Sequence, residues 1–78
     1  MTSPLYPAEK YTYRVLWSEE RQRYIGVCTE FPDLSYEAKT HVGALNGAIV
    51  RVREELESRR RSGGVIPDPI ALRLGGRL

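Results

Sequence analysis

The sequence predicts a small α+β domain in which an antiparallel sheet is covered on one face by one long helix. Alternating aromatic and β-branched residues fill two short runs near the start of the chain, as is typical of strands. A later run of apolar residues, spaced by three and four positions, is typical of an amphipathic helix. The expected order of elements is strand, strand, short strand, helix, short strand (β-β-β-α-β).

The first two strands are expected to form an antiparallel hairpin. Alternate positions of the first strand hold Tyr11, Tyr13, Val15 and Trp17. A polar turn over residues 18–22 leads to the second strand, whose two faces carry Tyr24, Gly26 and Cys28, and Ile25, Val27 and Thr29. Pro32 has no N–H to donate, so it is expected to end the second strand. Residues 34–38 are long enough for a short third strand.

The helix is predicted over residues 41–61. Thr40 is a good N-cap, because its hydroxyl can accept a hydrogen bond from a backbone N–H in the first turn. One apolar stripe follows, made of Val42, Leu45, Ala48, Ile49, Val52 and Leu56. The pairs Glu55–Arg59 and Glu57–Arg61 are spaced to stabilise its wet side. The dipeptide at positions 63–64, Gly-Gly, should end the helix.

The two ends of the chain are expected to differ. Residues 1–9 contain Pro4 and Pro7 and are predicted to be a flexible tail, which leaves residues 10–78 as the single domain. Near the other end Ile70, Leu72 and Leu74 alternate, so a last strand is predicted there.

Size and composition limit how the domain can be stabilised and where it works. With 78 residues, one cysteine and one histidine, it can form neither an internal disulfide nor a four-ligand zinc site. We therefore expect a dimer or larger homo-oligomer, with no metal and no cofactor. The first ten residues do not resemble a signal peptide, and no run approaches the ~20 apolar residues of a membrane span. A cytoplasmic protein is expected.

No catalytic constellation stands out. Cys28 lies mid-strand and is interpreted as a small buried residue, and His41 at the helix start is interpreted as a surface residue. Gly43 and Gly47 inside the helix indicate close packing rather than a phosphate loop. Six acids could form a carboxylate set for metal-dependent nuclease chemistry, but ordinary solvated acids are the interpretation we favour; they are Glu9, Glu19, Glu20, Glu30, Asp33 and Glu37.

The net charge of +2 is too small to indicate nucleic acid by itself. Residues 51–78 nevertheless carry seven Arg against four acids. Cations in the last helical turn complement the helix dipole, which explains much of this excess. The alternative is a nucleic-acid footprint made of Arg51, Arg59, Arg60 and Arg61.

Taken together, residues 11–69 resemble the HicB-like antitoxin family. The resemblance rests on the aromatic first strand, the run YIGVCTEFPDL, the Thr-capped helix with Ala44-Leu45, and Ile-Pro-Asp-Pro at positions 66–69. The chain departs from the family around the cap, where Glu-Ala-Lys precedes Thr40 and His-Val-Gly follows it, so the first turn of the helix has no acid. About nine residues follow Pro69 in the 78-residue chain, so we expect no C-terminal DNA-binding domain and regard DNA binding as doubtful.

The resemblance implies a partial RNase H-like fold and no enzymatic activity. It implies an antitoxin-like module that masks a small basic RNA-cleaving toxin (HicA-like). The expected partner-binding surface is an open sheet face with four aromatic side chains and nearby acids, namely Tyr11, Tyr13, Trp17, Tyr24, Glu30, Asp33 and Glu37. A nucleic-acid-binding protein, or an orphan HicB-like protein with another regulatory role, is the alternative.

Overall fold

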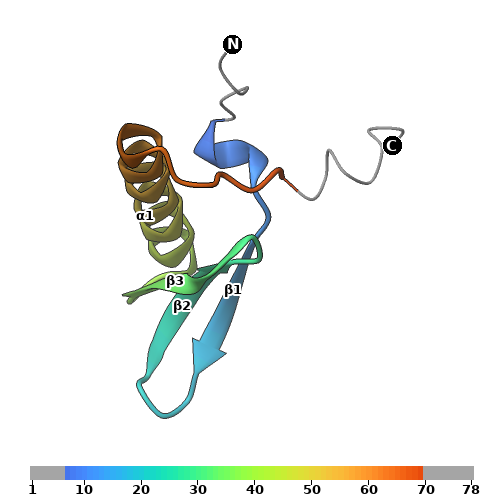
Figure 1. The fold of residues 1–78 in the computed structure, drawn as a ribbon. Coiled ribbons are helices and arrows are strands. Elements are labelled where there is room, and N and C mark those ends of the chain that lie inside the picture. Colours follow the sequence, from blue (N-terminus) through green and yellow to red (C-terminus); the bar gives the residue numbers. More distant parts are fainter. Residues whose placement is uncertain (1–6, 70–78) are drawn as a thin grey trace, which may run out of the picture.

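The computed structural model describes residues 7–69, in which a three-stranded antiparallel sheet carries one long helix on one face (Figure 1). A short 3-10 helix, η1 (Ala8–Lys10), comes first. Strands β1 (Tyr13–Ser18), β2 (Arg23–Cys28) and β3 (Phe31–Ala38) follow, and then helix α1 (His41–Ser62). The predicted α+β class and the first four predicted elements are confirmed. The predicted strand around Ile70, Leu72 and Leu74 lies outside the described residues.

The sheet has the order β1-β2-β3, with regular pairing between β1 and β2 from Tyr13 opposite Cys28 to Ser18 opposite Arg23. The third strand is longer than predicted, because it begins at Phe31 and so contains Pro32. The pairing of β2 with β3 shifts register between Val27 and Cys28. A proline is tolerated here because β3 is an edge strand that needs to donate on one side only.

Gly26 shows which face of the sheet meets the helix. A Cβ built on this residue would lie 2.2 Å from the carbonyl oxygen of Ala44 and 3.0 Å from the Cβ of Ala48, both in α1. Side chains in register with Gly26 therefore point toward α1, while those of the alternate positions point away. The helix-facing set is Tyr13, Val15, Trp17, Tyr24, Cys28, Tyr36 and Ala38.

Both ends of α1 are fixed as the sequence predicts. The Thr40 Oγ1 accepts a hydrogen bond from the Gly43 backbone N–H at 2.9 Å. At the other end Gly63 adopts the left-handed conformation, with φ of 75°, and its N–H donates to the Arg59 carbonyl. A residue with no Cβ takes this conformation at little cost, so the helix ends where glycine allows the chain to turn.

The core lies between η1, the α1-facing side of the sheet and the middle of α1. Its buried cluster contains Ala8, Tyr11, Cys28, Phe31 and Val52, and Ala44 and Ala48 are also buried along α1. Since Ala8 is 3% exposed, the end of the predicted tail packs against the domain instead of leaving it. Among the residues that the structure describes, most of the fully buried side chains are small, and larger apolar residues are only partly buried against them, namely Tyr13, Leu34, Ile49 and Leu56.

Candidate functional site

An exposed group of aromatic rings lies at the tip of the β1–β2 hairpin, next to the start of α1. The rings of Trp17 and Tyr24 meet edge to face with centroids 5.0 Å apart, and the ring of His41 lies 5.6 Å from that of Tyr24 in a similar geometry. The Trp17 indole N–H donates to Glu19 Oε1 at 2.8 Å. We call Trp17, Glu19, Tyr24 and His41 the tip cluster.

The tip cluster has the composition of a protein-binding surface. Trp17 is 48% exposed although it is the largest side chain in the protein, and His41 is also exposed. Aromatic side chains dominate the energetics of many protein interfaces. The hydrogen bond to Glu19 orients the indole before any partner binds, which reduces the entropy lost on association. The sequence does not predict the contact between Trp17 and Glu19, because it depends on how the turn closes.

Tyr11 and Tyr13, predicted to belong to the same partner-binding surface, lie at the other end of the sheet and on the α1-facing side. Tyr11 is 4% exposed and its hydroxyl donates to the Pro67 carbonyl at 2.7 Å. The Tyr13 hydroxyl donates to the Ala8 carbonyl at 2.7 Å, and burial raises its pKa well above the usual value. The two hydroxyls thus hold the segment after α1 and the η1 segment to the rest of the fold.

The predicted placement of the four aromatic residues on the open face is therefore wrong about the face. All four lie on the side that α1 covers, where Trp17 is half exposed and Tyr24 is partly buried beside His41 at the start of the helix. Strand alternation identifies two faces without saying which one the helix takes. Small residues on one face, such as Gly26, were the available signal, because only that face lets a helix with Ala44 and Ala48 approach closely.

The three predicted partner-binding acids are also divided between the two ends of the sheet. Glu37 lies near the hairpin tip and pairs with Arg21 at 2.7 Å. The Glu30 carboxylate accepts hydrogen bonds from Thr12, from the backbone N–H at 2.9 Å and from the hydroxyl at 3.1 Å. Six residues of β2 span about 20 Å, so Glu30 and Glu37 cannot act on one small group.

Glu30 and Asp33 border a recess of about 240 Å³ beside the end of α1. It is lined by Glu30, Phe31, Pro32, Asp33, Leu34, Glu55 and Arg59. Within residues 7–69 no group of three or more His, Cys, Asp or Glu side chains is arranged to hold a metal ion. Instead, Glu55 pairs with Arg59, Glu30 accepts a hydrogen bond from the Thr12 backbone N–H, and Asp33 is exposed to solvent.

Cys28 is buried and is held neutral. The residue is 2% exposed, and its thiol lies 3.4 Å from Glu30 Oε1. Burial raises the pKa of the Cys28 thiol to about 11, so the reactive thiolate is scarce at neutral pH. The predicted structural placement of this residue is confirmed.

The four arginines considered for nucleic-acid binding do not form one patch. Arg51 and Arg60 are nine residues apart, about 2.5 turns of helix, so they project from opposite sides of α1. Arg59 bonds to Glu55 at 2.7 Å and to the Val65 carbonyl at 3.0 Å. Arg60 and Arg61 both lie within 4.0 Å of Glu57. Their charge is thus dispersed and partly neutralised.

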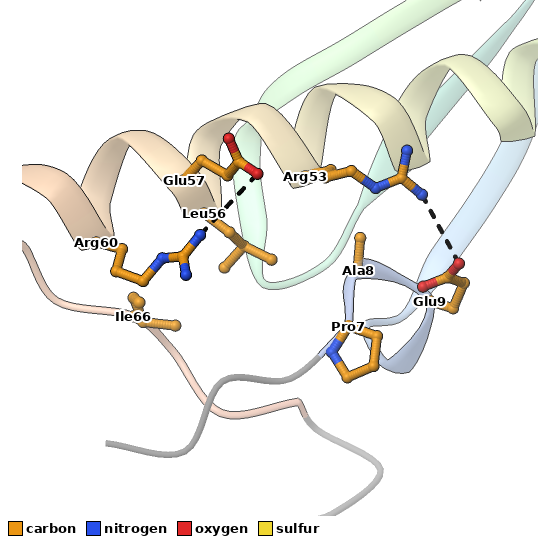
Figure 2. A pocket seen from close by; sticks show the side chains of 8 residues that line it. All are labelled: Pro7, Ala8, Glu9, Arg53, Leu56, Glu57, Arg60 and Ile66. Atoms are coloured by element: carbon orange, nitrogen blue, oxygen red, sulfur yellow. Dashed lines mark ion pairs between the residues drawn. The ribbon is translucent and has the colours of Figure 1, made fainter. Parts of the chain in front are cut away.

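A larger cavity, of about 410 Å³, lies between η1 and the second half of α1 (Figure 2). Ala8, Leu56 and Ile66 give it an apolar lining. Two loose ion pairs border it, Arg53 with Glu9 at 3.7 Å and Arg60 with Glu57 at 4.0 Å. The sequence does not point to this cavity, because its pattern places residues 1–9, which include η1, in a flexible tail.

Within residues 7–69 no helix is both long enough and apolar enough to cross a lipid bilayer. Comparisons of the chain with protein-family models, with curated proteins and with solved structures give no match.

Proposed function

We propose that this chain is a non-enzymatic protein-binding module of the HicB-like antitoxin type, with a partial RNase H-like fold. In the cytoplasm it would cover the active surface of a small basic RNA-cleaving toxin. The tip cluster is the observation that carries this proposal, and the motif resemblance supplies the class of partner. The buried thiol of Cys28 and the dispersed arginines favour protein binding over catalysis or nucleic-acid binding.

Charge around the hairpin tip supports a basic partner in part. Glu19 and Glu20 are exposed in the turn, and Glu37 is close by at the end of β3. Arg21 already pairs with Glu37, and that pair is largely exposed, so it contributes little and is readily exchanged for a partner's cation. Burial of Trp17 would provide most of the affinity, and these acids would orient the partner.

Self-association belongs to the same proposal. The buried core consists mainly of small side chains, and a chain of 78 residues gains stability from a second subunit. Sedimentation of the purified protein over a range of concentrations would test this. A strictly monomeric protein at high concentration would remove self-association from the proposal and leave the toxin-binding part intact.

The test is co-expression with the small basic protein encoded beside this chain, followed by co-purification and measurement of Kd. We expect a complex that relieves the neighbour's toxicity, and we expect Trp17→Ala to weaken it by about tenfold or more, which is about 1.4 kcal/mol. Leu16→Ala is the matched control, because Leu16 is 44% exposed and points to the opposite face.

Two results would contradict the proposal. The absence of any complex with a small basic neighbour would remove the antitoxin function. A complex that Trp17→Ala leaves unchanged would remove the tip cluster as its binding surface.

A further inference from the structure

The side of the sheet that faces away from α1 has an apolar centre. Its side chains come from the alternate positions of the three strands: Arg14, Leu16, Ser18, Arg23, Ile25, Val27, Ser35 and Glu37. Leu16 lies opposite Ile25 across β1 and β2, and Val27 is the next residue of this face along β2. We call this set the open face. Among the described residues no element packs on it, since α1 lies on the other side (Figure 1).

The rim of the open face is positively charged. Arg14 lies beside Leu16 on β1, and Arg23 lies beside Ile25 on β2, so the two arginines bracket the apolar pair. Among the ion pairs within residues 7–69, none involves Arg14 or Arg23. The acid of this face, Glu37, pairs with Arg21 at 2.7 Å, so it does not offset the charge of Arg14 or Arg23 in this structure. The open face therefore presents two unneutralised cations around an aliphatic centre.

We infer that the open face docks an amphipathic helix of a protein partner whose apolar stripe is flanked by Asp and Glu. A sheet buries its faces by packing against another layer, and α1 shows that this sheet accepts a helix on its other side. The flanking acids of the partner would meet Arg14 and Arg23. The centre is aliphatic and not aromatic, so it offers no platform on which nucleic-acid bases could stack.

The same charges argue against two other occupants. A second copy laid face to face would bring four arginines together against only two glutamates, one Glu37 from each copy. A basic toxin would meet the same repulsion. The partner of the open face is thus distinct from the partner proposed for the tip cluster, and this inference does not rest on the antitoxin function.

The test uses a designed peptide of about 18 residues, long enough to form a helix, with Leu on one stripe and Glu on its flanks. A second peptide with Lys in place of Glu is its matched control. Each peptide is titrated into ¹⁵N-labelled protein, and amide shifts are followed. We expect the Leu/Glu peptide to shift Leu16, Ile25 and Val27 and to bind more weakly at high salt, and the Leu/Lys peptide to bind at least about tenfold more weakly.

Charge reversal of the rim separates this inference from its alternatives. Arg14→Glu with Arg23→Glu should exchange the preference for the two peptides, while Arg51→Glu, on exposed α1 surface, should leave it unchanged. Equal binding of both peptides, shifts confined to other residues, or an unaltered preference in the double variant would each overturn it. Shifts of these amides on dilution without peptide would do so too, because they would show a second copy on the open face. If Trp17→Ala loses toxin binding but still binds the Leu/Glu peptide, that result bears on the tip cluster and not on the open face.

Discussion

At the scale of single residues, Arg59 connects three parts of the fold through one guanidinium group. Its Nε lies 2.7 Å from Glu55 Oε2, and one of its terminal nitrogens donates to the Val65 carbonyl at 3.0 Å. The guanidinium carbon lies 4.9 Å from the centre of the Phe31 ring. Arg59 thereby ties the start of β3 and the segment after α1 to the last turn of the helix. This role is structural, which explains why Arg59 is poorly placed for a ligand.

Replacing Arg59 by Gln is expected to lower the free energy of unfolding by roughly 1 kcal/mol, because a partly exposed ion pair and a cation–π contact are lost together. Arg60→Gln is the control, since Arg60 is half exposed and only 4.0 Å from Glu57 at its closest. Its effect should stay within about 0.5 kcal/mol. Urea unfolding of both variants measures the difference, and equal losses would refute the structural role of Arg59.

Residues whose function is local were predictable from the sequence, and residues with distant partners were not. Thr40 and Gly63 act on their own backbone neighbourhood, so composition and position identify them. Glu30 bonds to Thr12, eighteen residues away in the chain, and nothing in the sequence announces that pairing. The tip cluster is predictable in part: the sequence identifies Trp17 and Tyr24 as aromatic strand residues, whereas the contact of Glu19 depends on the path of the turn.

At the scale of elements, the spacing between α1 and the sheet depends on glycines on both sides. Gly26 in β2 leaves room for the Ala44 carbonyl, and Gly47 in α1 leaves room for the Tyr36 ring, where an added Cβ would lie 2.0 Å from the nearest ring atom. The two contacts differ in what must move. At Gly26 the obstacle is helix backbone, whereas at Gly47 it is a side chain that is 44% exposed and can rotate away.

Gly26→Ala is therefore expected to destabilise the protein more than Gly47→Ala. The first change forces α1 away from the sheet, at a cost of about 1–3 kcal/mol. In the second, displacement of Tyr36 is offset by the helix propensity of Ala, which is worth about 1 kcal/mol over Gly. Urea unfolding of both variants tests this order. Adding Tyr36→Ala should relieve Gly47→Ala but not Gly26→Ala, and relief of both would show that the obstacle at Gly26 is not the helix backbone.

Element boundaries followed from local signals, but the assignment of faces did not. The hairpin and the helix were predicted because their periodicities differ, two for strands and 3.6 for helices. The third strand was predicted too short, because Pro32 weighs against pairing when neighbouring strands are unknown. Which face α1 covers is a property of the assembled sheet. The four aromatic residues therefore lie on the α1-facing side, whereas the sequence predicts them on the open face.

At the scale of the whole molecule, stability should decrease in alkaline solution. Burial raises the pKa of Cys28 from 9.0 to about 11, and it raises the pKa of Tyr13 as well. The folded protein then keeps protons that the unfolded chain releases above about pH 9, so the unfolded state gains stability as pH rises toward 11. The stabilisation present below pH 9 is lost through this window.

Urea unfolding at about pH 8 and about pH 10.5 measures this effect. The free energy of unfolding should fall for the parent protein, and it should fall less for Cys28→Ala, which removes one of the two groups. Comparing each protein with itself at the two pH values cancels the cost of the small cavity left by the substitution. An equal fall in both proteins would show that Cys28 does not contribute.

The hairpin tip also determines how the molecule could be joined to others. In Figure 1 the two ends of the described chain, η1 and the segment that follows α1, lie on the opposite side of the molecule from the β1–β2 turn. A reporter, a solid support or a further domain joined through these two segments would therefore leave Trp17, which is 48% exposed, accessible at the hairpin tip. The arrangement suits a recognition element that is carried on other structures while its contact surface stays accessible.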